Sequence, residues 1–142
     1  MEKRYVEFIE GLELLDIYLG SSSFKRHAFP DPEKYPEVRA SLAPGKTVYA
    51  QTKTELHVDQ EMSFLLEEVA KSRKKTRKIF ELSGVFTLVY KTTAPMDDEM
   101  FELFKKSNIP VNLHPYMREL IHNTMTRAGM PSFTLPVLKI KR

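Results

Sequence analysis

Alternating apolar and polar residues near the start of the chain are typical of a β-strand. Residues 12–19 read Leu-Glu-Leu-Leu-Asp-Ile-Tyr-Leu, and this period-two pattern predicts a half-buried strand that continues toward Arg26. Apolar residues in 7–15 also recur at helical spacing, so a helix is the alternative for that segment. The prolines within 27–36 exclude a regular element there and predict a connection.

Two further strands are predicted by the segments that follow this connection. Residues 38–42 predict a short strand, which the Pro-Gly turn signal at 44–45 would end. Residues 46–58 have the most regular period-two pattern, and we predict one continuous strand with Val48 and Leu56 on the same face.

Residues 78–90 predict another long strand, in which Gly84 marks a bulge or a close approach of two backbones. The segment 59–77 that precedes it has two interpretations. Its apolar residues fit a helix capped by Asp59 and followed by a solvated basic loop at 71–78. The alternative is a long irregular hairpin.

The last third of the chain has helical patterns. Carboxylates at 97–99 and lysines at 105–106 match the charge preferences of the two ends of a helix. A second helix is predicted over 113–128, where apolar residues recur at helical spacing, and Gly129 suits a left-handed cap. The segment 133–140 is predicted to be extended. Together the elements predict an α+β fold, with a four-stranded antiparallel sheet followed by a short and a long helix.

Composition narrows the class of protein. The 142 residues suit a single domain spanning 1–142, and 42% hydrophobic with 29% charged residues is typical of a globular chain. The absence of cysteine excludes disulfide-stapled modules and thiol chemistry. No apolar run is long enough to span a membrane, and charges near the N-terminus interrupt any signal peptide, so we expect a cytoplasmic protein without membrane insertion.

No catalytic or cofactor-binding motif occurs in the sequence, so we predict neither an enzyme nor a cofactor. His114 and His122 are too far apart along one helix to share a metal, and no metal site is expected. The basic run 71–78 has the charge to contact phosphates but no aromatic residue to stack on a base. A solvated loop is therefore the favoured interpretation of this run.

Several short motifs are similar to those of one known family. Residues 112–119 read Asn-Leu-His-Pro-Tyr-Met-Arg-Glu, with Ala-Gly-Met-Pro at 128–131 and Thr-Leu-Pro-Val at 134–137. Together with Pro-Glu-Val at 36–38, they resemble the SecB family of protein-export chaperones, in which a helix with a Pro-Tyr-x-Arg-Glu start ends in a Gly/Pro turn. The order of the predicted elements also agrees with that family.

The resemblance implies a protomer that assembles as a dimer of dimers and binds unfolded client chains in long apolar grooves. By correspondence with the family, the client-binding positions on the second strand would be Val38, Ala40 and Leu42. Their position in the helical region adds Met117, Ile121 and Met130.

The sequence also departs from the family. Members that deliver clients to the SecA motor have an acidic sheet face and a zinc-binding C-terminal tail. The matching face positions here are Ser21 and Lys25, and only Glu81 retains an acid as a partner-docking residue. Because the sequence ends at 139–142 without such a tail, neither a zinc site nor SecA docking is expected. Residues 59–77 have no counterpart in the family and are interpreted as an insertion.

These observations predict an ATP-independent holdase that keeps client polypeptides unfolded. The client would be a protein for export or a dedicated partner, such as the antitoxin of a toxin–antitoxin pair. The alternative is a nucleic-acid-binding regulator that uses the 71–78 segment. Binding to phosphates would weaken steeply with salt, whereas apolar client capture would persist.

Overall fold

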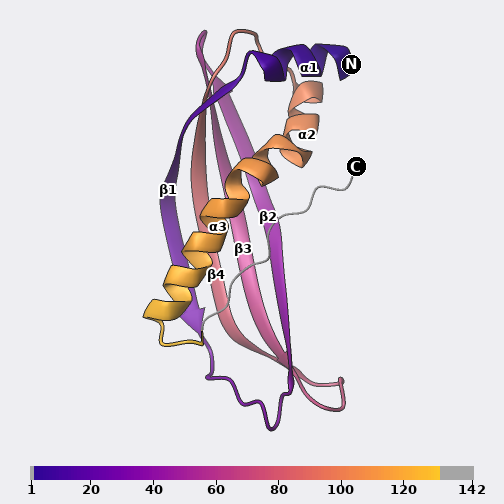
Figure 1. Ribbon diagram of the computed structural model, residues 1–142, viewed down its shortest axis with the longest axis vertical. Helices are drawn as coiled ribbons and strands as arrows, with labels where there is room; N and C mark the ends of the chain where they lie inside the picture. The colour runs from indigo at the N-terminus through magenta and orange to yellow at the C-terminus, as the bar shows by residue number, and fades with distance from the viewer. Residues whose placement is uncertain (1, 132–142) are drawn as a thin grey trace.

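The computed structural model, which describes residues 2–131, contains one antiparallel sheet with helices α2 and α3 on one of its faces (Figure 1). The elements in chain order are α1 (Glu2–Glu10), β1 (Glu13–Arg26), β2 (Glu37–Gln51), β3 (Glu55–Val69), β4 (Thr76–Lys91), α2 (Asp98–Lys106) and α3 (Asn108–Arg127). The strand order is β1-β4-β3-β2, so β1 and β2 are the two edges. The predicted α+β fold is confirmed, and the extended segment predicted over 133–140 lies outside the described residues.

The segment predicted as one strand over 46–58 is instead a hairpin. The chain turns at 52–54, where the Thr52 hydroxyl accepts a hydrogen bond from the Glu55 backbone N at 3.1 Å. The alternation of apolar and polar residues continues through this turn, so the sequence pattern alone contains no break. The turn nevertheless exchanges the faces, because Leu56 is buried beneath the helices whereas Val48 is exposed on the opposite face.

Residues 59–69 belong to β3, so the helix predicted within 59–77 is wrong and the hairpin alternative is confirmed. β3 pairs with β2 on one side and with β4 on the other, which satisfies its backbone in both directions. Its even-numbered residues, such as Phe64 and Leu66, face the helices and are buried, apart from the partly buried Met62. The segment interpreted as an insertion therefore supplies a central strand, and only 70–75 form the turn to β4.

β2 continues through 44–45, where a turn was predicted. A register shift between Pro44 and Thr47 marks a β-bulge at this point. An edge strand tolerates proline because one side of its backbone has no ladder partner within the protomer. The Pro-Gly pair therefore bends β2 without ending it.

The N-terminal helix α1 lies earlier in the chain than the helical alternative for 7–15, and residues 13–15 belong to β1. The Tyr5 hydroxyl donates a hydrogen bond to Asn108 Oδ1 at 2.7 Å and lies 2.9 Å from Ser107 Oγ. These contacts attach α1 to the junction of α2 and α3, at one end of the sheet (Figure 1).

Both predicted C-terminal helices are present, but the second begins five residues earlier than predicted. Asp97 caps α2 by accepting a hydrogen bond from Met100 N at 2.8 Å. α3 begins at Asn108 rather than at 113, because Pro110 falls in its first turn, where no helical N–H partner is needed. Gly129, with φ of 72°, has the predicted left-handed conformation after the helix.

The core lies between α3 and the helix-side residues of β3 and β4. α3 contributes a buried side chain every fourth residue: Ile109, Leu113, Met117, Ile121 and Met125. The edge strand β1 is covered much less, and of its 14 residues only Ile17 is buried.

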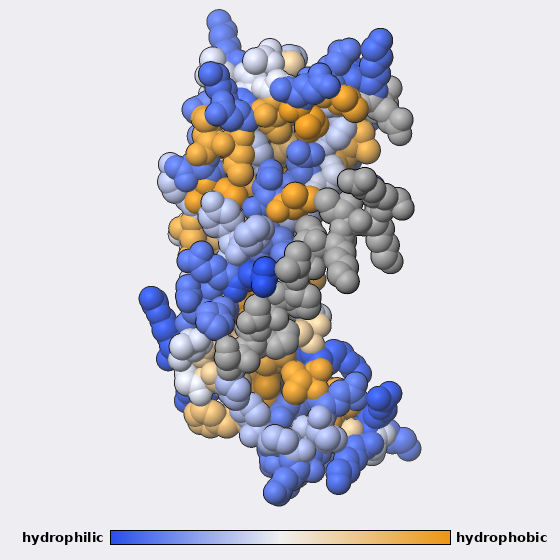
Figure 2. Space-filling model, viewed as in Figure 1, coloured by the Kyte–Doolittle hydropathy of each residue, from blue (hydrophilic) through white to orange (hydrophobic). Residues whose placement is uncertain are grey.

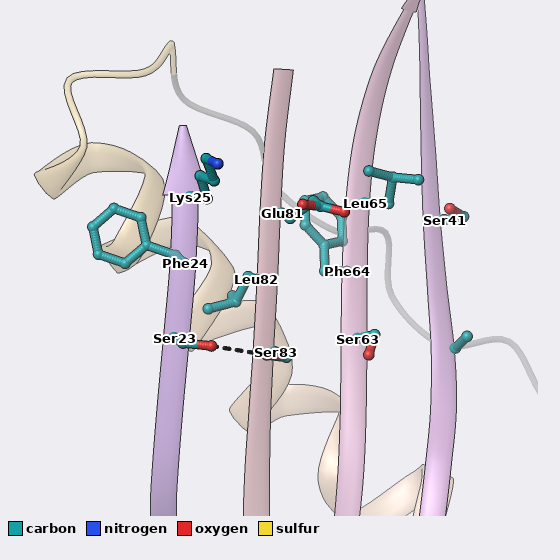
Figure 3. A pocket seen from close by; sticks show the side chains of 11 residues that line it. Ser23, Phe24, Lys25, Ser41, Ser63, Phe64, Leu65, Glu81, Leu82 and Ser83 are labelled. Carbon is teal, nitrogen blue, oxygen red and sulfur yellow. Dashed lines mark hydrogen bonds between the residues drawn. The ribbon is translucent and has the colours of Figure 1, made fainter. Parts of the chain in front are cut away.

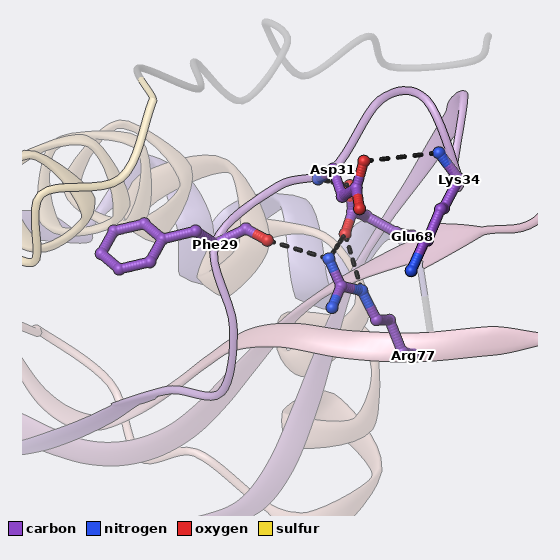
Figure 4. Close-up of polar contacts among 5 residues, drawn as sticks. All are labelled: Phe29, Asp31, Lys34, Glu68 and Arg77. Carbon is purple, nitrogen blue, oxygen red and sulfur yellow. Dashed lines mark hydrogen bonds and ion pairs between the residues drawn. The ribbon is translucent and has the colours of Figure 1, made fainter.

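Polar contacts hold the proline-containing connection 27–36 against the end of the sheet (Figure 4). Arg77 on β4 donates a hydrogen bond to Phe29 O at 2.9 Å, and Glu68 on β3 accepts one from Asp31 N at 2.9 Å. The connection is therefore positioned by side chains rather than by strand pairing.

Candidate functional site

An apolar groove lies between β2 and the N-terminal half of α3. The apolar residues that line it are Leu42, Pro44, Met62, Ile109, Pro110, Leu113 and Met117. Its volume is about 200 Å³. Pockets that enclose whole small molecules mostly measure about 300–1,000 Å³. The groove therefore suits a side chain of a longer polypeptide better than a compact ligand.

The bulge in β2 shapes one wall of this groove, and Gln60 on β3 holds the bulge. Gln60 is 2% exposed. Its Oε1 accepts a hydrogen bond from Thr47 Oγ1 at 2.5 Å, and its Nε2 donates to Glu61 O at 2.8 Å and Gly45 O at 3.5 Å. Because both the oxygen and the nitrogen of this buried amide are hydrogen-bonded, Gln60 fixes the backbone around Pro44. The groove wall is therefore pre-formed before a ligand binds.

At one end the groove continues into a hollow lined by lysines. The two cavities share the lining residues Pro44, Gln60, Lys105 and Pro110. The hollow adds Lys46 and Lys106 as cations and Glu102 as an acid. Lys105 Nζ lies 3.2 Å from Glu102 Oε1. The apolar groove is thus bordered by positive charge on one side.

Two of the predicted client-binding residues, Leu42 and Met117, meet in this groove. Val38 and Ala40 lie on the same helix-side face of β2, because they alternate with Arg39 and Ser41. Both are exposed, and α3 crosses the sheet away from their end of β2 toward β1 (Figure 1). Figure 2 shows this face of the molecule, on which hydrophobic and hydrophilic residues are interspersed.

The predicted positions in the helical region are core residues in this structure. Met117 and Ile121 are fully buried, and Met130 is 6% exposed. Met117 borders the groove, whereas Ile121 packs α3 onto the sheet. A client would reach Ile121 or Met130 only if α3 or the segment after it moved, so their role in binding stays a prediction.

The opposite face of the sheet carries a shallow hollow of about 560 Å³ (Figure 3). One serine from each strand lines it: Ser23, Ser41, Ser63 and Ser83. The Ser23 and Ser83 hydroxyls lie 3.0 Å apart across β1 and β4. These small side chains keep this part of the face shallow.

Glu81, the predicted docking residue, lies on this serine-lined face among cations. Lys25 on β1 is its register partner, and its carboxylate contacts His27 Nε2 at 2.8 Å and Lys78 Nζ at 3.1 Å. The hydrogen bond with His27, and then the one with Lys78, lowers the pKa of Glu81. Ser21 lies on the same face, opposite Val85 in the register. The docking role of Glu81 stays a prediction.

The basic run 71–78 is partly neutralised by ion pairs. Arg73 lies 3.5 Å from Glu37, Arg77 2.7 Å from Glu68 and Lys78 3.1 Å from Glu81. Half of its six cations therefore already have a carboxylate partner. This arrangement weakens the alternative of a phosphate-binding surface.

Between residues 2 and 131, no three His, Asp or Glu side chains are grouped so that they could hold a metal ion. Within the same range, no helix has both the length and the apolar character needed to span a bilayer.

Comparison with known proteins was informative at the level of structure. No protein-family model and no curated protein matched the sequence. The Mycobacterium tuberculosis Rv1957 SecB-like chaperone, solved in complex with a ChAD peptide from the Rv1956 HigA1 antitoxin, matches with a TM-score of 0.78. The match covers 98% of this chain and 99% of that chain at 15% sequence identity. The chain has a SecB-like fold. A Streptococcus agalactiae protein of unknown function also matches, with a TM-score of 0.49 and 13% identity over 89% of this chain and 97% of that chain.

Within this SecB-like fold, sequence reasoning found one residue of each groove wall and missed the others. The sequence places Pro44 in a turn, and Gln60 in a segment that fits either a helix or an irregular hairpin. In the sequence, Lys105 is explained by its place at a helix C-terminus, and Lys46 has no predicted role. A proline inside a strand pattern is itself a signal for an edge strand or bulge, and it could have placed Pro44 beside Leu42.

Proposed function

We propose that this protein is a chaperone that binds unfolded segments of client polypeptides without ATP and without catalysing a reaction. The observation that carries the proposal is the apolar groove between Leu42 and Met117 in a SecB-like fold. A groove this small does not enclose a folded ligand, whereas one apolar side chain of an unfolded chain fits it. No nucleotide-binding motif in the sequence would couple release to ATP.

An extended client has two kinds of contact available along β2. An apolar side chain enters the groove beside Leu42, and alternate side chains of the same segment lie over Ala40 and Val38. Because β2 is an edge strand, its free backbone groups are placed to pair with the client backbone. Apolar burial supplies affinity, and backbone pairing makes binding tolerant of sequence.

A dedicated client is the form of this function that we favour. Rv1957 was solved with an antitoxin peptide, and an antitoxin of comparable chemistry is the client that we propose here. The cationic surroundings of Glu81 support a client other than a SecA-bound export substrate. A cytoplasmic location fits this role.

We further propose that the protein is a homo-oligomer, arranged as a dimer of dimers. β1 is an open edge that carries exposed apolar side chains: Leu14, Leu15, Tyr18, Leu19 and Phe24. Burying such an edge against a second copy would satisfy its backbone and cover these side chains. Light scattering of the purified protein tests this state, and a monomer at micromolar concentration would contradict it.

The function is tested by suppression of aggregation. An unfolded substrate is diluted into buffer without ATP, with wild type, Leu42→Glu or Ala43→Glu. Ala43 is the matched control, because it is the next residue of β2 and faces the opposite side of the sheet. We expect protection by wild type and Ala43→Glu, and at least a tenfold weaker effect of Leu42→Glu, since a carboxylate in the groove opposes apolar burial. Equal protection by a folded Leu42→Glu variant would remove the groove from the mechanism.

A further inference from the structure

The apolar groove and the lysine-lined hollow form one continuous surface, so an apolar binding site lies directly beside positive charge. The lining residues Pro44 and Lys105 belong to both cavities. A segment seated in the groove would therefore pass within reach of the hollow, since neighbouring residues of an extended chain are roughly 3.3 Å apart.

The charge in the hollow is only partly neutralised within the protomer. Lys105 pairs with Glu102, and Glu61 accepts a hydrogen bond from the Lys46 backbone N at 3.0 Å. Among the described residues, the ammonium groups of Lys46 and Lys106 form no ion pair. Two exposed cations thus flank the groove with their charge available to a partner.

We propose that the groove selects client segments in which an acidic residue stands two positions from an apolar anchor. In an extended segment, side chains two residues apart point to the same face, roughly 7 Å from each other. With the anchor between Leu42 and Met117, this spacing directs the acid toward Lys46 and Lys106. The inference rests on the proposed chaperone function and deepens it by naming the chemistry of the client.

Charge at the border of an apolar site acts mainly on selectivity. The carboxylate stays partly hydrated beside exposed lysines, so it contributes little affinity by itself. A client lysine at the same position would be repelled. The difference in binding free energy between an acidic and a basic client is therefore larger than the attraction or the repulsion alone.

The test uses three end-capped, fluorescein-labelled peptides of Ser and Thr with a Leu-Ser-Leu anchor. They carry Glu, Gln or Lys two residues from the anchor on both sides and are otherwise identical. Binding is followed by fluorescence anisotropy at low and moderate salt. We expect the Glu peptide to bind about tenfold more tightly than the Lys peptide at low salt, with Gln between them and a smaller spread at moderate salt.

Two double variants assign the selectivity to particular lysines. Lys46→Gln/Lys106→Gln should bind the three peptides within about twofold of one another. Lys25→Gln/Lys91→Gln removes the same charge from the opposite face of the sheet and should keep the wild-type order. Equal binding of the three peptides to wild type, or an unchanged order in Lys46→Gln/Lys106→Gln, would overturn the inference and leave the chaperone proposal intact. Failure of all three peptides to bind, together with failure to suppress aggregation, would overturn both.

Discussion

Arg77 donates two hydrogen bonds to one oxygen of Glu68, from Nε at 2.9 Å and from Nη2 at 2.7 Å (Figure 4). The Glu68 side chain is 1% exposed, and its other oxygen accepts the Asp31 backbone N–H. The Arg77 guanidinium also lies 4.5 Å from the centre of the Tyr35 ring. A buried ion pair thus ties β3 and β4 to the connection 27–36, which enters β2 next to the exposed Val38.

Loss of this ion pair should destabilise the fold. In Arg77→Ala, Glu68 keeps a buried charge without its cation, and we expect the free energy of unfolding to fall by about 3 kcal/mol. Urea denaturation measures this change. The control is Glu37→Gln, which removes the exposed pair with Arg73 and should cost less than about 1 kcal/mol. Similar losses in the two variants would mean that the buried pair contributes no more than a surface pair.

Tyr90 should make the protein sensitive to alkaline pH. Burial raises its pKa to about 12 from the ordinary value of 10.0, although a hydrogen bond from Asn112 at 2.8 Å opposes the shift. The unfolded chain loses the phenolic proton first. The contribution of Tyr90 is therefore complete below pH 10 and decreases, by up to about 3 kcal/mol, as pH rises to about 12.

The variant Tyr90→Phe isolates this effect. It should be slightly less stable than wild type at neutral pH, because it lacks the hydroxyl that accepts from Asn112. As pH rises above 10, wild type should lose stability faster, so the difference between the two should shrink and then reverse. Parallel pH profiles in denaturant unfolding would show that Tyr90 titrates normally.

Gly129 should resist substitution because of its backbone conformation. A Cβ at this position would meet no atom closer than Arg26 Nη1 at 3.8 Å, so space is available, but φ of 72° is unfavourable for alanine. We expect Gly129→Ala to lower the free energy of unfolding by about 1 kcal/mol. Thermal unfolding measures this change. Gly20 in β1 has no such φ, so Gly20→Ala should be near neutral in the same measurement.

Gln60 should link the stability of the bulge to client binding. Gln60→Ala removes three hydrogen bonds around the bulge and should cost about 2 kcal/mol, whereas Thr47→Val removes one of them and should cost about 1 kcal/mol. Since the bulge places Pro44 and Lys46, we also expect Gln60→Ala to weaken peptide binding in the anisotropy assay. A stable variant with unchanged binding would show that the groove wall does not depend on this amide.

Sequence periodicity predicted a helix or strand correctly where the pattern of residues was compatible with only one type of secondary structure. The charges and the apolar stripe of α2 and the glycine after α3 agree with a helix and with nothing else, and the structure has them there. Residues 59–69 fitted both a helix and a strand. Pairing with β2 and β4 decided between them, and that pairing joins residues far apart in the sequence.

In the candidate site, too, some features could be predicted from the sequence and others depend on tertiary packing. The positions of Leu42 and Met117 followed from a resemblance to a chaperone family, but their meeting in one groove depends on how α3 crosses the sheet. The lysines beside the groove carry no local signal of a binding site, because a lysine in a strand and two in the last turn of a helix look like ordinary solvated charges. Only the packing of α2 and α3 over the bulge in β2 brings them together.

The sequence by itself therefore determined the class of fold, the two C-terminal helices and the likeness to SecB, since local patterning and short motifs encode these. The tertiary structure decided where the chain turns between β2 and β3, which methionines are core and where the apolar groove meets positive charge. These features depend on strand register and on helix position over the sheet. Both are set by contacts between distant residues, which no local pattern specifies.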